Sequence, residues 1–451
     1  MQNIKRTFWG GLFLLTILWL LADQSVFQST GFFAVRAWAI QYSGIVAIAA
    51  MSVAMILALR PRWPERWFGG LDKMYRLHKW LGIAALAVSV AHWLWAQGAK
   101  WAVGYGWLAR PERGERQVPE NPIEAFLATM RGPAEGLGEW AFYAAVVLIV
   151  VALVRLVPYR YFYKTHRLLA PVYLVLVFHT VVLAQFSYWM SPLGVVLAIL
   201  LAGGVWASIV VLLRRVGVGR QVKGRIVSLQ YYPAVQSLEA EIDLAEGWPG
   251  HKAGQFAFAT SDQSEGAHPF TIASAWNAAS RRITLVAKEL GDYTGRLRET
   301  LSVGHEVKLE GPYGCFAFDD GRPRQIWIGG GIGVTPFIAG MKQLKLDRES
   351  SPGGARTREI DLFHTTADYD EAAIRKLEAD AEAAAIRMHV LVDPRDGLLT
   401  GERVRAAVPG WRDASIWFCG PPAFGKALRD DFAAQGFPVA KRFHQELFAM
   451  R

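Results

Sequence analysis

The sequence predicts a membrane all-α bundle of six helices, followed by an antiparallel β-barrel and a doubly wound α/β domain. Three observations predict this fold class. Long apolar runs are confined to residues 1–213, short strands broken by turns follow, and strands then alternate with helices around a glycine-rich turn. A chain of 451 residues has room for two to four domains. We expect their boundaries at 1–215, 219–320 and 322–451.

The composition excludes several classes of protein. Hydrophobic residues make up 52% of the chain and charged residues 20%, which excludes a disordered protein and disfavours a single soluble domain. The two cysteines, Cys315 and Cys419, are too few for a disulfide scaffold or a cysteine-ligated zinc or iron–sulfur site. The net charge of +10 could indicate nucleic acid, but membrane topology explains it, so no nucleic-acid partner is expected.

Each candidate membrane helix approaches the length of about 20 residues that crosses a bilayer. The six segments are 7–22, 38–59, 78–97, 139–157, 166–186 and 192–213. The first follows Lys5 and Arg6, as a signal peptide would, but no small-residue cleavage motif comes after it. We therefore expect an uncleaved first helix and a multi-pass protein surrounded by membrane lipid.

Basic residues predict the orientation of these helices. They are frequent between helices 2 and 3, between helices 4 and 5, and after helix 6, whereas the connection between helices 5 and 6 has none. The positive-inside rule then places both termini and the C-terminal half in the cytoplasm, with the protein in the cell membrane. The longer loop 98–138 is expected outside. Its residues Lys100, Trp101, Tyr105, Trp107 and Arg110 are expected to shape the outer surface.

Four of the ten histidines lie in two of the six helices, His78 and His92 in the third and His166 and His179 in the fifth. A polar ring in hydrocarbon is costly, so it indicates a function. The alternative for a single histidine is an interhelical hydrogen bond. Each pair spans about 20 Å along its helix, which places His78 level with His166 and His92 level with His179. Two imidazoles facing each other at each of two depths would hold two six-coordinate b-type haems.

The helical phase of the two pairs differs. The 14 residues from His78 to His92 fall about 40° short of four turns, and the 13 from His166 to His179 fall about 140° short. The fifth helix must therefore bend or begin irregularly. Pro171 supplies a reason, because proline lacks the backbone donor that a continuous helix requires.

The segment after Lys223 predicts a small antiparallel barrel with strands at 224–231, 238–244, 255–260, 282–287 and 306–310. Within it, the residues His268-Pro269-Phe270-Thr271 predict an exposed ring and hydroxyl beside a rigid turn. The segment 291–295 predicts a glycine turn that opens a helix, where backbone N–H groups can meet a phosphate. Ordinary turn chemistry is the alternative for each motif alone.

The last segment has the context of a dinucleotide-binding fingerprint. Strand 325–328 leads into the turn 329–336 and then an apolar helix, and Pro336 replaces the last glycine as a good first helical residue. Further strands are expected at 360–363, 388–391 and 415–418. The last ends at Cys419-Gly420-Pro421-Pro422, which switch-point geometry places beside the nucleotide.

Together these motifs resemble, in their order, the ferric reductase / NADPH oxidase family joined to a ferredoxin–NADP reductase-like module. The resemblance implies an enzyme, a flavohaem transmembrane oxidoreductase. It also implies that one set of residues holds FAD and another holds the nucleotide, and that Phe448 near the C-terminus covers the flavin. The FAD residues are His268, Pro269, Phe270, Thr271, Ser274, Gly291 and Thr294. The nucleotide residues are Gly330, Gly331, Gly333, Thr335, Pro336, Cys419, Gly420 and Pro421.

The resemblance also implies a role for Arg36 near the outer haem, although an arginine extending to a membrane edge is the alternative. Superoxide-producing relatives carry another histidine four residues beyond the outer ligand of helix 3, where this chain has Ala96. That departure weakens the case for dioxygen as the dedicated acceptor.

The expected electron path runs from NADPH to FAD, to the haem at His78 and His166, to the haem at His92 and His179, and to an external acceptor. The acceptor would be a ferric chelate, or dioxygen to give superoxide. An electron-transfer subunit supplying quinone or a redox partner protein is the alternative, and a transporter is disfavoured because repeat symmetry is missing.

The nucleotide preference follows from the end of strand 360–363. His364-Thr365-Thr366 stand there, where an NAD-selective site often has an acidic residue. This favours NADPH, with NADH as the alternative. Phe448 is expected to swing off the flavin before hydride transfer, and Cys419 to line the nicotinamide pocket.

Overall fold

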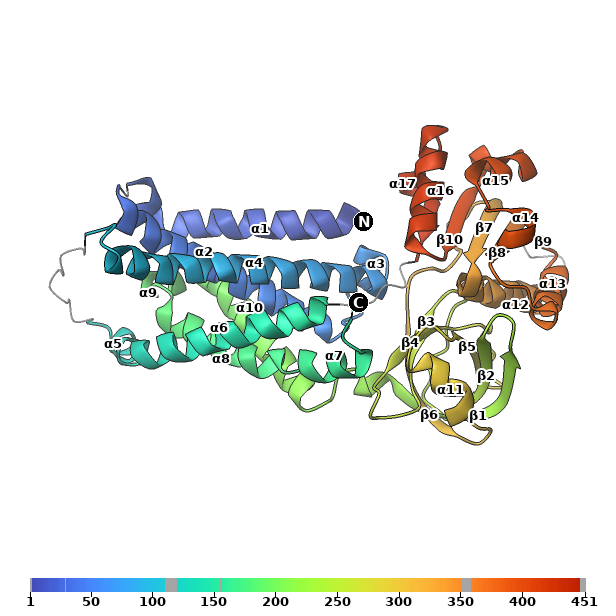
Figure 1. Cartoon of the computed structure of the whole chain (residues 1–451), viewed down its shortest axis with the longest axis horizontal. Helices are drawn as coiled ribbons and strands as arrows, with labels where there is room; N and C mark the ends of the chain where they lie inside the picture. Colours follow the sequence, from blue (N-terminus) through green and yellow to red (C-terminus); the bar gives the residue numbers. More distant parts are fainter. Residues whose placement is uncertain (1, 29, 110–119, 155, 351–357, 447–451) are drawn as a thin grey trace. The chain divides into compact units, whose positions relative to one another are not determined.

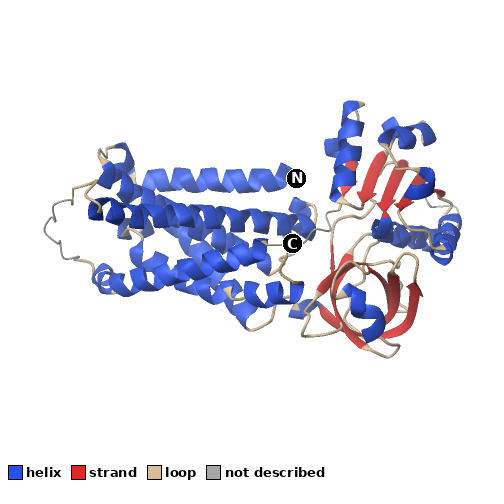
Figure 2. Cartoon of the chain, viewed as in Figure 1, coloured by secondary structure: helices blue, strands red, loops and turns tan. Residues whose placement is uncertain are grey.

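A computed structural model describes residues 2–28, 30–109, 120–154, 156–350 and 358–446. The chain divides into two compact units, one formed by residues 1–68 and 73–216 and the other by residues 69–72 and the chain from Gly217 onward. The first unit consists of helices, whereas the second combines helices with two sheets (Figure 2).

The six predicted membrane helices are confirmed, so this is a multi-pass membrane protein. The spans are Gln2–Ala22, Phe32–Ala58, Leu71–Gly104, Arg131–Leu153, Tyr159–Leu183 and Pro192–Leu212, which contain α1, α2, α4, α6, α7 with α8, and α10 (Figure 1). Most begin several residues before the apolar segment. The polar residues that flank an apolar run continue the helix, because a helical backbone satisfies its own hydrogen bonds at a membrane boundary.

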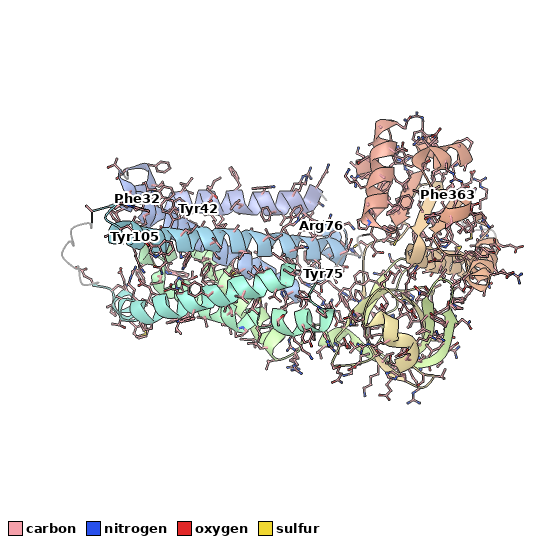
Figure 3. The ribbon with its side chains drawn as sticks, viewed as in Figure 1. Phe32, Tyr42, Tyr75, Arg76, Tyr105 and Phe363 are labelled. Carbon is pink, nitrogen blue, oxygen red and sulfur yellow. The ribbon has the colours of Figure 1, made fainter. Side chains whose placement is uncertain are left out.

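Shorter helices connect these spans: η1 (Gln24–Phe27), α3 (Glu65–Phe68), α5 (Pro122–Thr129) and α9 (Phe186–Trp189). The segment 98–138, expected as a loop, is partly helical. Helix α4 continues to Gly104, and Asn121 caps α5 by accepting a hydrogen bond from the Ile123 N–H at 2.9 Å, with Pro122 in the first turn. Tyr105 follows the end of α4 (Figure 3), whereas Arg110 lies outside the described residues.

The bundle is packed around α8 and α10. Helix α10 packs against α2 and α8, and α6 packs against α8. Tyr173 of α8 is fully buried, with its hydroxyl 2.7 Å from Ser52 Oγ of α2. Gly204 of α10 faces that ring, and a Cβ there would overlap it. A second buried cluster joins α1 to α2, where the Trp19 ring centroid lies 4.8 Å from that of Tyr42.

The first sheet of the soluble unit has six antiparallel strands in the order β4-β3-β6-β1-β2-β5. The strands are β1 (Gln221–Tyr232), β2 (Ser237–Leu244), β3 (Phe256–Thr260), β4 (His268–Thr271), β5 (Arg282–Lys288) and β6 (Glu306–Tyr313). A bridge between Ile272 and Leu285 brings the two edge strands together. The predicted barrel is therefore confirmed, and η2 (Val218–Arg220) leads into it.

One motif differs from its expected conformation. Residues 268–271 form strand β4, where a turn was expected, and Thr271 is buried. Pro269 is tolerated because β4 pairs in a ladder on one side only, with β3, so the missing N–H leaves no second ladder incomplete.

The second sheet has five parallel strands in the order β11-β10-β7-β8-β9. They are β7 (Arg324–Gly330), β8 (Glu359–Thr366), β9 (Arg387–Val392), β10 (Ser415–Cys419) and β11 (Phe443–Gln445). Helices α12 (Thr335–Ser350) and α13 (Glu371–Ala383) supply side chains to one core, and α15 (Gly401–Ala407) and α16 (Pro422–Ala434) supply them to a second. Two cores divided in this way are those of a doubly wound sheet, as predicted.

Candidate functional site

The four membrane histidines form two facing pairs. The ring centroids of His78 and His166 are 5.8 Å apart, and those of His92 and His179 are 6.3 Å apart. Two imidazoles that each bind one metal ion through a ring nitrogen at about 2.0 Å would have centroids about 6 Å apart. The spacing in both pairs therefore fits a shared iron.

Hydrogen bonds to main-chain carbonyls orient the rings of His78, His92 and His179. Nδ1 lies 2.9 Å from Ala54 O in His78, 3.0 Å from Ile40 O in His92 and 2.8 Å from Ala134 O in His179. A carbonyl oxygen only accepts, so each Nδ1 carries the proton and Nε2 keeps its lone pair. This is the arrangement of a metal-binding histidine whose other nitrogen is held by the protein.

The helices that carry the rings stand apart from each other. Among the described residues, the closest helix pairs are α6 with α8 and α10 with α2 and α8, and none of them includes α4. The histidine rings nevertheless meet from α4 on one side and α7–α8 on the other. The donor set and the spacing therefore fit one haem at each pair.

Small residues behind the His92–His179 pair were not identified from the sequence. A Cβ at Gly138 of α6 would overlap the His179 ring, and one at Gly44 of α2 would lie 3.2 Å from His92 Cε1. Ser43 Oγ lies 3.1 Å from His92 Nδ1 and donates its own proton to Ala39 O. The glycines in residues 131–139 could have indicated this contact, because glycine inside a membrane helix often marks close packing against another helix.

Arg36 joins α2 to the C-terminal part of α4. Its Nε donates to Trp95 O at 3.0 Å and its Nη2 donates to Ala96 O at 3.1 Å. Ala96 therefore accepts a hydrogen bond from Arg36 through its main chain. Nearby on α4, Gln97 donates to Glu139 of α6 at 2.9 Å, and Tyr143 donates to the same carboxylate oxygen at 2.7 Å.

The barrel residues expected to hold FAD lie on β4 and on the turn before η3 (Thr294–Arg296) and α11 (Leu297–Thr300). The His268 ring stacks on Tyr293 at 3.9 Å with an 11° angle, and burial lowers the pKa of His268 to about 4, so the imidazole is neutral at pH 7. Thr271 Oγ1 is buried and has no hydrogen-bond partner among the described residues. A buried hydroxyl without a partner fits a bound polar ligand.

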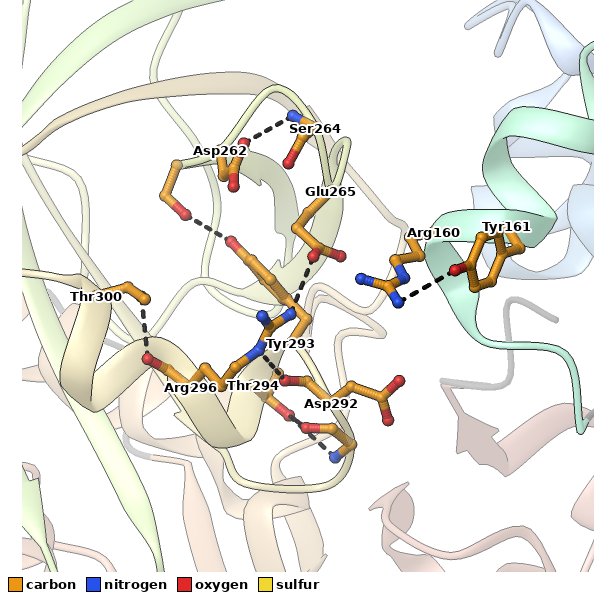
Figure 4. Close-up of polar contacts among 12 residues, drawn as sticks. Arg160, Tyr161, Asp262, Ser264, Glu265, Asp292, Tyr293, Thr294, Arg296 and Thr300 are labelled. Atoms are coloured by element: carbon orange, nitrogen blue, oxygen red, sulfur yellow. Dashed lines mark hydrogen bonds and ion pairs between the residues drawn. The ribbon is translucent and has the colours of Figure 1, made fainter.

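The glycine turn leads into η3 and α11, and two backbone N–H groups at its start are bonded to a side chain of the same segment. Thr294 Oγ1 accepts from the N–H groups of Leu290 and Gly291 at 3.0 and 3.2 Å. Arg296 closes the turn, because its guanidinium donates to Asp292 O and to Glu265 at 2.9 Å each (Figure 4).

Ser274 is held by a residue that the sequence analysis missed. His251 Nε2 donates to Ser274 O at 3.0 Å, and His251 Nδ1 accepts from the Trp248 indole at 3.4 Å. Burial lowers the pKa of His251 to about 4, which keeps this neutral tautomer at pH 7. Ser274 Oγ accepts from the Thr284 N–H at 3.0 Å, which fixes the segment after β4.

The two predicted nucleotide motifs meet at the switch point of the second sheet, between β7 and β10. A Cβ at Gly333, in η4 (Gly331–Val334), would overlap the Cys419 carbonyl, and one at Gly330 would lie 3.0 Å from Pro421. Only residues without side chains permit this approach. Thr335 and Pro336 begin α12 and are buried, and the Thr335 hydroxyl donates to Ile332 O at 2.7 Å.

The Cys419 side chain lies in the core. It is fully buried beside Trp417 and Val334, and burial raises the pKa of the thiol well above its usual range. Cys419 is therefore a neutral packing residue in this conformation. Phe448 lies outside the described residues.

Comparisons with known proteins agree with the division of the chain into a membrane part and a soluble part. Residues 43–177 match the model of the ferric reductase-like transmembrane component, and residues 222–317 match that of an FAD-binding domain. Ferric reduction oxidase 5 of Arabidopsis thaliana is 42% identical over 81 residues, which are 17% of this chain and 12% of that protein. The glycine betaine monooxygenase reductase subunit of Chromohalobacter salexigens is 26% identical over 196 residues, 40% of this chain and 50% of that protein.

The chain thus spans half or less of these relatives' own lengths. Among solved structures, an Amycolatopsis cytochrome P450 reductase aligns with 51% of this chain and 70% of its own, at 26% identity and a TM-score of 0.42. The matched FAD-binding domain and the reductase relatives support FAD and a pyridine nucleotide as cofactors.

Proposed function

This chain belongs to the ferric reductase-like family of transmembrane flavoprotein oxidoreductases, and on that premise we propose that it carries electrons across a membrane. The donor is a cytoplasmic nicotinamide nucleotide, the carriers are FAD and two b-type haems, and the acceptor lies on the opposite side. The observation that carries this proposal is the pair of facing histidines at each of two levels.

The protein's contribution is placement and orientation. When bound, FAD takes two electrons from a nucleotide and passes on one at a time, as a haem requires. His78 with His166, and His92 with His179, would hold the irons, and main-chain carbonyls fix the tautomers of His78, His92 and His179. The glycines at the switch point let the nucleotide backbone approach closely, and Arg36 supports the outer end of α4.

The acceptor we propose is a small molecule, a ferric chelate or dioxygen, which would give superoxide. If the two histidines of each pair both bind the iron, no position on the metal is left for the acceptor, which would then react elsewhere on the haem. The alternative is an electron-transfer subunit that supplies quinone or an extracytoplasmic protein. The orientation we propose has both termini in the cytoplasm and the cell membrane as the location, since the basic loops alternate strictly.

Two measurements test this function. A reduced-minus-oxidised spectrum of the purified protein should show b-type haem together with flavin, and flavin without haem would refute the proposed path. Turnover with an Fe(III) chelate or cytochrome c, with and without superoxide dismutase, then separates the acceptors. Loss of cytochrome c reduction on adding the dismutase would identify dioxygen, and direct reduction of the chelate would identify iron.

A further inference from the structure

We propose that Asp393, held in place by Thr365, makes the nucleotide site select NADH over NADPH. This inference rests on the proposed function, since it assumes a nicotinamide nucleotide as the donor. It reverses the preference expected from sequence, which depended on the lack of an acidic residue at the end of strand 360–363. The acidic residue in the structure comes from the next strand, β9.

Asp393 lies on the edge of the sheet where a nucleotide binds. In the parallel register, Gly330 of β7 pairs with Thr365 of β8, and Thr366 of β8 pairs with Val392 of β9, directly before Asp393. Neighbouring strands lie about 4.8 Å apart, so Leu391, two residues before Asp393, lies about 10 Å across the sheet from Gly330. A dinucleotide with its diphosphate at that turn would extend its adenosine ribose along this edge.

The Asp393 carboxylate is oriented for a ligand. Thr365 Oγ1 donates to Asp393 Oδ1 at 2.6 Å, while Oδ2 makes no hydrogen bond to the described part of the chain. The residue begins α14 (Asp393–Asp396) and is partly exposed. A carboxylate accepts a hydrogen bond from a ribose 2′-hydroxyl, whereas it repels a 2′-phosphate.

The groups expected to bind a 2′-phosphate are already engaged. Burial lowers the pKa of His364 to about 4, so it is neutral at pH 7, and its Nδ1–H donates to Gly329 O at 3.3 Å. Thr365 donates to Asp393, and Thr366 Oγ1 donates to Asp368 O at 2.9 Å. None of the three adds positive charge at this edge.

Two arginines that follow Asp393 in the sequence also have hydrogen-bond partners. Arg395 makes two hydrogen bonds to Asp396, at 3.0 and 2.9 Å. Arg403 Nη1 donates to the main-chain oxygens of Asp396, Gly397 and Leu398, at 2.8–3.2 Å. To pair with either arginine, a 2′-phosphate would have to replace that arginine's hydrogen bonds and also approach the negatively charged Asp393.

Stopped-flow flavin reduction on the full chain tests the inference. The wild-type second-order rate constant for flavin reduction should be at least about tenfold larger with NADH than with NADPH. Asp393→Asn should reduce that ratio about tenfold, mainly by speeding the reaction with NADPH. Asp347→Asn removes one exposed carboxylate from α12 and should leave the ratio unchanged. Preference of the wild type for NADPH, or an unchanged ratio in Asp393→Asn, would overturn the inference.

Binding gives an independent readout. Calorimetry with 5′-AMP and with 2′-phospho-5′-AMP on the full chain should show tighter binding of the first, and Asp393→Asn should bring the two affinities together. Thr365→Val keeps the Asp393 carboxylate but removes the hydroxyl that donates to it. It should therefore reduce the ratio of the two affinities by less than Asp393→Asn does. If Asp393→Asn loses flavin, Asp393→Ser replaces it. Failure of either nucleotide to reduce a flavin-loaded wild type contradicts the proposed function instead.

Discussion

The two histidine-bearing spans place their rings toward each other in different ways. Helix α4 is continuous from Leu71 to Gly104 and carries His78 and His92 on one face. The opposite span is broken: α7 ends at His166, and α8 begins at Leu169. The 13-residue spacing on that side would place its two rings about 140° from alignment on an unbroken helix. The break between α7 and α8 lets both pairs face each other, so spacing alone predicts the geometry of α4 but not that of its partner.

The predicted cause of the break is consistent with the observed position. Pro171 lies in the first turn of α8 and has no N–H to donate to the Arg167 carbonyl four residues earlier. Arg167 in turn donates a side-chain hydrogen bond to Val211 O of α10 at 3.3 Å. The support behind the outer pair also differs: α2 backs His92, whereas α6 backs His179.

Loss of a ligand should have the largest effect on either helix. We expect His92→Ala and His179→Ala each to remove the outer haem, because a missing axial imidazole weakens haem retention, while FAD still binds. Haem and flavin content of each purified variant is the measurement. A variant that still holds two haems would contradict the assignment.

The difference in backing predicts unequal effects for two glycine substitutions. Gly138→Ala should destabilise the protein by about 2 kcal/mol and reduce outer-haem content, because the new methyl would overlap the His179 ring. Gly44→Ala, whose methyl would lie 3.2 Å from His92, should cost less than about 1 kcal/mol. Thermal unfolding followed by the haem absorbance compares them, and equal losses would refute the asymmetry.

Restoring the continuity of α7–α8 should have a smaller effect. Pro171→Ala supplies the missing N–H, so we expect the two segments to straighten and the His166 ring to rotate. Both haems should be retained, with a changed electron paramagnetic resonance signal for one of them. Pro192→Ala, in the first turn of α10, is the matched control. Identical spectra for Pro171→Ala and the wild type would show that the break does not depend on this proline.

The smallest effect is expected from Ser43→Ala. Ser43 Oγ is a second acceptor for the His92 Nδ1–H, and a held proton makes the imidazole a stronger donor to iron. Its loss should raise the midpoint potential of the outer haem by less than about 60 mV, the one-electron equivalent of a tenfold change. A redox titration checks this, and a lowered potential would contradict the assigned hydrogen bond.

Periodic features of the fold could be predicted from the sequence. Apolar length identified all six spans, alternation identified the barrel, and the glycine turn identified the doubly wound sheet. The short strand β11 was missed, since three residues carry too little pattern. Strand β4 was taken for a turn because Pro269 disfavours strands except at an edge, and edges are set by tertiary pairing.

At the site, residue types were predictable, whereas their hydrogen-bond partners were not. The four histidines followed from their spacing, but Gly138 behind His179 depends on how α6 meets α8. Cys419 stands beside the expected nucleotide motif, yet its thiol faces the core. Asp393 follows a different strand from the one expected to supply the acidic residue, and only the parallel register brings it next to Thr365.

The two levels of histidine pairs have an electrical consequence. An electron that moves from one level to the other travels about 20 Å within a hydrocarbon core about 30 Å thick. A full crossing changes its energy by about 2.3 kcal/mol for each 100 mV of membrane potential. With the proposed orientation, an inside-negative potential drives electrons outward, and each turnover discharges part of that potential. Sustained activity would therefore require a compensating flow of ions through other proteins of the same membrane.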